Sequence, residues 1–229
     1  MYEGNDTVNI NEAMKLGKAH ISLDFYENST GKDTLNINAD VTGLGTTKNS
    51  SFDLGGGDDA INIDKGAVLK AATINTGDGN DNVKLNGELQ DTPDYWHSTS
   101  SIDLGSGNDT LHIGKDAIMD VGTTIKGGAG TDTLDIAGNI DFSKVAGFEK
   151  VSLGGSANNV TLNLTLDDVL NITNGNGTNR TLRIDGESGD HVHMSSDFGP
   201  GVSSGGYTTF TTTSGTNTFT IEVKDELVF

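Results

Sequence analysis

Six aspartates recur along the chain, and each stands two residues after a glycine: Asp6, Asp33, Asp59, Asp81, Asp109 and Asp132. Counted from their glycines, the six units are 27, 26, 22, 28 and 23 residues apart. A glycine turn lets the backbone curl so that several carbonyl oxygens point at one place. Ca²⁺ takes about six to eight oxygen ligands, from carbonyls and carboxylates alike. The residue types therefore indicate a hard-cation site at these turns.

Four of the turns carry a longer motif. The most complete copy is Gly127-Gly128-Ala129-Gly130-Thr131-Asp132-Thr133-Leu134, which fills the fixed positions of G-G-x-G-x-D-x-U-x, where U is a large apolar residue. In this respect the chain resembles the RTX proteins, whose nonapeptide repeat binds calcium. The resemblance implies ions between the turns of neighbouring coils, and a non-enzymatic structural role in a large secreted RTX adhesin.

The same resemblance assigns the ligands by position. Side chains would come from Asp6, Asp33, Asp59, Asp81, Asp109 and Asp132. The carbonyl-donating turns would hold Gly55, Gly57, Gly77, Gly79, Gly105, Gly107, Gly128 and Gly130. Asp6 and Asp33 match without the first glycines of the motif. The alternative is that aspartate and glycine only form tight turns, which both residues favour.

The segments that flank each turn alternate between apolar and polar residues, as strands with one buried face do. The pairs expected to point inward are Leu35/Ile37, Ile61/Ile63, Val83/Leu85, Leu111/Ile113 and Leu134/Ile136. Tandem RTX nonapeptides would recur roughly every nine residues, whereas here one turn occurs per coil of about 25 residues. We therefore predict an all-β fold, a parallel β-solenoid with the turns stacked along one edge.

The repeat changes after Ile140, so we divide the chain into a calcium-binding solenoid, residues 1–140, and a terminal region, residues 141–229. In the terminal region Asn159 is expected in the place of a turn aspartate. Thr165 is expected to cap a short helix. Two strands, Tyr207–Thr213 and Thr218–Val223, are predicted to form a hairpin that covers the open end of the solenoid.

Composition excludes several classes of protein. The chain carries 33 acidic and 14 basic residues, a formal charge of −19, which disfavours nucleic acid and anionic lipid and favours a cation. No apolar run approaches the length of a membrane span, so no membrane insertion is expected. There is no cysteine, so an extracellular chain of this kind would need a staple other than a disulfide.

Three other groups of residues suggest different chemistry. Tyr95 and Trp96, in the longest segment between turns, could stack on a host or cell-surface glycan. His191 and His193 lie on one side of a strand but lack a third zinc ligand at a telling spacing. A polysaccharide-modifying parallel β-helix enzyme would need a basic residue among acids, and the only arginines, Arg180 and Arg183, show no such constellation.

The resemblance also implies a cellular setting. RTX proteins leave Gram-negative cells through the type I secretion machinery, so the chain is expected outside the cell or on its surface. Its last residues, Glu226 to Phe229, resemble the C-terminal signal of some substrates of that route, although they would equally finish a capping strand. Because Met1 to Asp6 enter in the middle of a repeat, further repeats are expected upstream.

Overall fold

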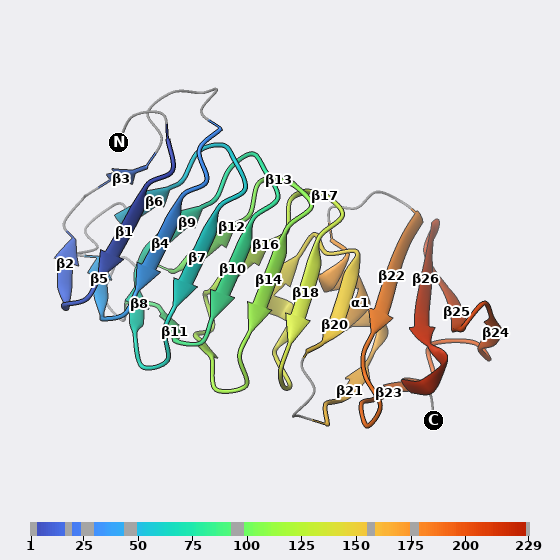
Figure 1. Ribbon diagram of the computed structural model, residues 1–229. Helices are drawn as coiled ribbons and strands as arrows, with labels where there is room; N and C mark the ends of the chain where they lie inside the picture. Colours follow the sequence, from blue (N-terminus) through green and yellow to red (C-terminus); the bar gives the residue numbers. More distant parts are fainter. Residues whose placement is uncertain are drawn as a thin grey trace.

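The computed structural model describes residues 4–16, 20–23, 30–43, 50–92, 99–154, 159–174 and 179–227. Short strands of successive coils lie side by side along one axis, which makes the molecule an elongated parallel β-solenoid (Figure 1). The predicted all-β solenoid is therefore confirmed.

Three sheets form the walls of the solenoid, and their strands are parallel except for β25 and β24 at the C-terminal end of the long sheet. The long sheet contains, in spatial order, β1 (Thr7–Ile10), β4 (Thr34–Ile37), β7 (Ala60–Ile63), β10 (Asn82–Leu85), β14 (Thr110–Ile113), β18 (Thr133–Ile136), β20 (Lys150–Leu153), β22 (Asn179–Asp185), β26 (Asn217–Lys224), β25 (Tyr207–Ser214) and β24 (Val202–Ser204). The second sheet contains β2 (Met14–Leu16), β5 (Val41–Gly43), β8 (Val68–Lys70), β11 (Glu88–Gln90) and β15 (Ile118–Met119). The third contains β3 (His20–Ser22), β6 (Ser50–Asp53), β9 (Ala72–Asn75), β12 (Ser101–Asp103), β16 (Thr124–Lys126) and β19 (Val145–Ala146).

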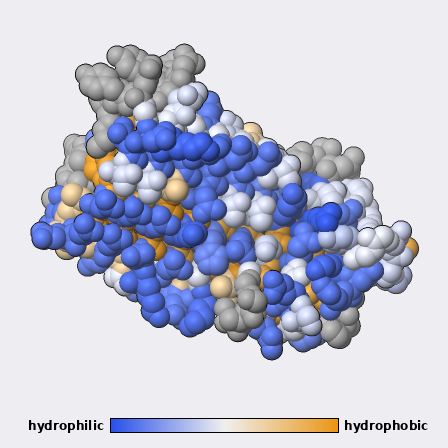
Figure 2. Space-filling view, in the orientation of Figure 1, coloured by the Kyte–Doolittle hydropathy of each residue, from blue (hydrophilic) through white to orange (hydrophobic). Residues whose placement is uncertain are grey.

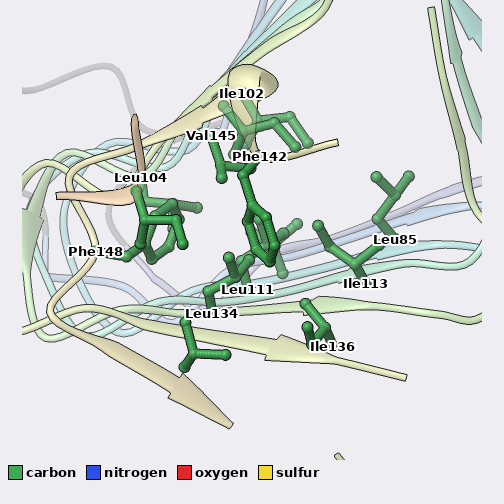
Figure 3. Close-up of a cluster of buried hydrophobic side chains, with 14 of the residues drawn as sticks. Leu85, Ile102, Leu104, Leu111, Ile113, Leu134, Ile136, Phe142, Val145 and Phe148 are labelled. Carbon is green, nitrogen blue, oxygen red and sulfur yellow. The ribbon is translucent and has the colours of Figure 1, made fainter. Parts of the chain in front are cut away.

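The core is a ladder of aliphatic side chains held in register. Val83 is aligned with Ile61 in the preceding coil and with Leu111 in the following one. All five inward pairs predicted from the alternation are buried, each residue with no more than 1% of its surface exposed. Parallel pairing without slippage puts like residues above one another, because a shift of one residue would turn every apolar side chain outward. Figure 3 shows Phe142 extending between Ile102 on one side of the coil and Leu111 of the long sheet on the other.

The segment that connects a strand of the long sheet to the next strand of the second sheet, here called the corner, alternates between two lengths in the middle coils. Residues 64–67 and residues 114–117 separate the strands in two coils, whereas only Asn86 and Gly87 do so in the coil between them. Lys65 Nζ reaches over this short corner to Asp116 Oδ2, 2.7 Å away and two coils distant. Successive coils therefore differ in length while alternate coils match at this corner.

The C-terminal region closes the solenoid with a hairpin and a helix. Strands β25 and β26 form the predicted antiparallel hairpin, and β26 also pairs in parallel with β22. Helix α1 (Leu166–Ile172) begins with a capping box between Thr165 and Asp168 and buries Val169 and Ile172. The helix packs against β19 and the 3₁₀ turn η1 (Phe142–Lys144), at the end of the third sheet. The predicted hairpin and the Thr165 cap are thus confirmed, and the long sheet runs on through both regions.

The surface is polar on the face that Figure 2 shows, where a hydrophilic band follows the upper edge of the molecule. Strands β13 (Ser106–Gly107) and β17 (Ala129–Gly130), which belong to the glycine turns, lie at that edge in Figure 1. Among the described residues, no helix has the length and apolar character needed to cross a membrane.

Candidate metal centre

The glycine turns join the third sheet to the long sheet. In the coil of β12 and β14, for example, the turn runs through residues 104–109. All eight glycines predicted to lie in carbonyl-donating turns have positive φ, between +90° and +145°. Residues with a Cβ rarely adopt this conformation, so the glycines are required by the shape of the backbone.

Successive turns stack so closely that a side chain would not fit between them. A Cβ added to Gly105 would lie 2.0 Å from the carbonyl oxygen of Gly77, and one added to Gly107 would lie 1.7 Å from that of Gly79. Carbonyl oxygens of one turn therefore face the backbone of the next. Between these glycines, the N–H of Ser106 donates to Gly77 O at 2.8 Å, which holds the turns in register.

The turn aspartates form a single column along this edge. In each coil, the backbone N–H of the aspartate donates to Oδ1 of the aspartate in the next coil at 2.7–2.9 Å, in the order Asp6, Asp33, Asp59, Asp81, Asp109 and Asp132. The last five have no more than 2% of their surface exposed. The structure therefore brings all six predicted aspartates together, one per coil.

In two buried members of the column, one carboxylate oxygen has no hydrogen-bond partner. Within the described part of the chain, Oδ2 of Asp109 and Oδ2 of Asp132 accept no hydrogen bond and are shielded from solvent. A buried oxygen of this kind costs about 1–3 kcal/mol or more if nothing binds it. Oδ2 of Asp132 lies at its glycine turn, 2.9 Å from the Cβ position of Gly127, so this turn has a donor atom available for a cation.

The electrostatics of the column also favour a cation. The pKa of Asp109 is raised to about 7, chiefly because the carboxyl is buried, and the neighbouring carboxylates of Asp81 and Asp132 contribute to that rise. Burial likewise raises the pKa values of Asp81 and Asp132 above the ordinary range. A column of buried like charges opposes its own ionisation, and a divalent cation between the turns would remove that cost.

The donor set fits calcium better than a transition metal. Nowhere in the described ranges do three His, Cys, Asp or Glu side chains converge on one point. A bound ion would therefore need backbone carbonyl oxygens beside one or two carboxylates. Zn²⁺ is bound by side-chain nitrogen, sulfur and carboxylate ligands, whereas Ca²⁺ accepts carbonyl oxygens readily.

A second row of polar side chains, not foreseen from the sequence, lies one residue before the aspartates. Oδ1 of Asn80 accepts from the N–H of Asn108 at 2.9 Å, and Oδ1 of Asn108 accepts from the N–H of Thr131 at 2.9 Å. Asp58 does the same for the N–H of Asn80 at 3.0 Å. These residues satisfy turn N–H groups. The recurring Gly-Asn-Asp was the signal that could have identified them.

The predicted place of Asn159 in the row of turn aspartates is wrong. The strand before Asn159, β20, lies in the long sheet, and the strand after it, β21 (Thr161–Leu164), pairs with β23 (His191–Met194) in a separate sheet, so Asn159 does not precede a strand of the long sheet. Asn159 lies off the column, where its Oδ1 is 2.5 Å from the Cβ position of Gly189. The pair of glycines after Leu153 resembles the turn motif in sequence, but it follows a strand of the long sheet, whereas the turn motif precedes one.

The other candidate residues lie away from the turns. His191 and His193 are on β23 (His191–Met194), which pairs with β21 (Thr161–Leu164). Arg183 stacks on Tyr207, with its guanidinium carbon 4.0 Å from the ring centre, and Arg180 lies over Phe219 at 5.5 Å. Both arginines thus pack within the C-terminal hairpin region. Tyr95 and Trp96 lie outside the described residues.

Comparison of the chain with protein-family models, with curated proteins and with solved structures found no match.

Proposed function

We propose that this chain is a non-enzymatic calcium-binding structural module of the RTX type, in which ions at the glycine-aspartate edge complete the fold. The observation that carries the proposal is the aspartate column. Its five members after Asp6 are buried, and each uses one carboxylate oxygen for the ladder. In Asp109 and Asp132 the other carboxylate oxygen has no hydrogen-bond partner among the described residues.

Calcium would act here as a folding cofactor. Without it the buried carboxylates oppose one another in a chain whose formal charge is already −19. With it, two neighbouring turns would share one ion, and the binding free energy would become folding free energy. Calcium modules that work outside cells bind with dissociation constants of roughly 10⁻⁴–10⁻³ M, so we expect folding in the millimolar range.

The proposed setting follows from the sequence motif. A module that stays unfolded in a calcium-poor cytoplasm suits export through the type I secretion machinery, followed by folding outside the cell. The motif also supports membership in a surface adhesin, with this chain as a spacer that calcium stiffens. The absence of cysteine supports calcium as the staple.

A calcium titration followed by circular dichroism tests the proposal. The chain in chelator should be largely disordered and should gain β-structure cooperatively as calcium rises into the millimolar range. Mg²⁺ is the matched control, because it demands near-octahedral geometry and keeps its water ligands. It should not replace calcium at equal concentration.

A protein that is equally folded in excess chelator would contradict the proposal. So would a transition that Mg²⁺ produces at the same concentration. Equilibrium dialysis of the folded protein should find several bound ions per chain.

A further inference from the structure

The aspartate column does not end at Asp132. The residue before each strand of the long sheet occupies one register position, and Lys150 is aligned with Thr133 on one side and Arg183 on the other. Glu149 therefore follows Asp132 in the column. In the next two strands, the residues aligned with Glu149 are Leu182 in β22 and Ile221 in β26. Both are fully buried, so the carboxylates stop at Glu149.

Glu149 makes the same hydrogen bond as the aspartates. Its Oε2 accepts from the backbone N–H of Asp132 at 2.7 Å. Each aspartate after the first accepts from the preceding coil in the same way, at 2.7–2.9 Å. The glutamate side chain thus continues the ladder by one step.

A shorter turn explains why a glutamate stands here. Ala146 is aligned with Lys126, but only two residues separate Ala146 from Glu149, whereas five separate Lys126 from Asp132. The connection from the third sheet to the long sheet is therefore shorter in this coil. Its Phe148 side chain points into the interior of the solenoid and is fully buried (Figure 3). The extra methylene of glutamate allows its carboxylate to reach the column from this shorter turn.

The shortened turn also supplies a carbonyl. A Cβ added to Gly127 would lie 2.1 Å from the carbonyl oxygen of Gly147 and 2.9 Å from Oδ2 of Asp132. On the other side, a Cβ added to Gly128 would lie 2.0 Å from Gly105 O. The last glycine turn is therefore enclosed by carbonyl oxygens from both neighbouring coils, as an inner turn would be.

We propose that Glu149 is the terminal carboxylate ligand of the cation column and serves the ion at the turn of residues 127–132. This inference rests on the proposed calcium function. The alternative is a purely structural role, in which Glu149 accepts a hydrogen bond from the Asp132 N–H but does not bind a cation.

Two substitutions separate these roles. Glu149→Gln keeps an oxygen that can accept the Asp132 N–H but removes the charge, whereas Glu149→Met removes both at similar length. Glu187→Gln is the matched control, because Glu187 is an exposed glutamate in a turn outside the column. The readout is hydrogen exchange of peptides from the turns, measured at increasing calcium concentration.

In the wild type, calcium should protect the amides of every glycine turn, including residues 127–132. In Glu149→Gln the calcium needed to protect residues 127–132 should rise about tenfold or more, because the site loses ligand charge. The turns of Gly55 to Asp59 and Gly77 to Asp81 should respond as before. Glu149→Met should show at least the same loss, and Glu187→Gln none.

Unchanged protection of residues 127–132 in Glu149→Gln, with a loss in Glu149→Met alone, would overturn the inference and leave a structural cap. The proposed function would survive that result. If calcium protects no turn of the wild type, the proposed function itself fails.

Discussion

The backbone N–H of Asp81 donates to Oδ1 of Asp109 across 2.7 Å, 28 residues later in the chain, while Oδ2 of Asp109 accepts no hydrogen bond from any described residue. One oxygen of the Asp109 carboxylate thus holds two coils together, and the other is free to bind a cation. Substitutions can remove these two roles separately.

Asp109→Asn should raise the calcium concentration at the folding midpoint about tenfold or more. The amide oxygen can still accept the N–H of Asp81, but the charge is gone, and an interaction with a charged group contributes about 1.5–3 kcal/mol. Asp109→Ala should raise the midpoint further, because it also leaves the buried N–H of Asp81 without an acceptor. Circular dichroism at increasing calcium measures both. Equal midpoints for Asp109→Asn and wild type would show that the charge of Asp109 has no part in folding.

Asp190 provides the contrasting case of a buried aspartate outside the column. Its Oδ1 accepts from the N–H of Val160 and its Oδ2 from the N–H of Glu187, each at 2.8 Å. Both oxygens are therefore used by the protein. Asp190→Ala should lower the unfolding free energy in saturating calcium by roughly 2–4 kcal/mol, because two N–H groups lose their acceptor.

The number of bound calcium ions should not change in Asp190→Ala, whereas removal of Asp81 or Asp109 should weaken binding at their turns. Urea denaturation and equilibrium dialysis give the two quantities. Loss of an ion in Asp190→Ala would mean that the column is not the whole metal centre.

The sequence was sufficient to predict the coil. The inward pairs, such as Val83 and Leu85, follow a period of two on both sides of each turn, and only a parallel stack buries them all. The turn glycines were predictable for a related reason. Their conformation and their contact with the next turn both exclude a Cβ, so the motif recurs at each turn.

Glu149 could not be predicted in the same way. Its turn has lost three residues relative to the turn before it, and with them the glycine pattern, so no motif marks the position. Only the register of β20 against β18 places Glu149 in the column. The prediction for Asn159 failed for the opposite reason, since a glycine pair stands before it in the sequence but the strand that follows Asn159 does not belong to the long sheet.

Without calcium, the protein should lose β-structure as the pH rises from 5 to 7.5. The folded pKa of Asp109 is about 7, above the ordinary value of about 4 for aspartate. The folded state therefore binds more protons than the unfolded state between these values. Stability is greatest below about pH 4 and falls as the pH rises through 7.

Circular dichroism in calcium-free buffer at pH 5 and pH 7.5 measures this effect. Asp109→Asn should depend less on pH in that range. Calcium affinity should change in the opposite direction and increase with pH, because the ion displaces protons from the column. A calcium-free protein with more β-structure at pH 7.5 than at pH 5 would contradict the assignment.

Gly107→Ala should prevent the turns of neighbouring coils from stacking, even in saturating calcium. Gly107 has φ of +140°, and an added Cβ would lie 1.7 Å from the carbonyl oxygen of Gly79, a backbone atom that cannot move alone. Gly66→Ala is the matched control, because Gly66 also has positive φ, +89°, but has open space where the Cβ would go. The control should cost only the strain of an unfavourable backbone, about 1–2 kcal/mol.

Gly107→Ala adds the clash to that strain, so its loss of unfolding free energy should exceed the loss in Gly66→Ala by several kcal/mol. It should also leave the turns around residues 79 and 107 unprotected in hydrogen exchange. Urea denaturation at millimolar calcium compares the two variants. Equal losses would show that backbone strain alone fixes the glycines, and that close approach of the carbonyls does not.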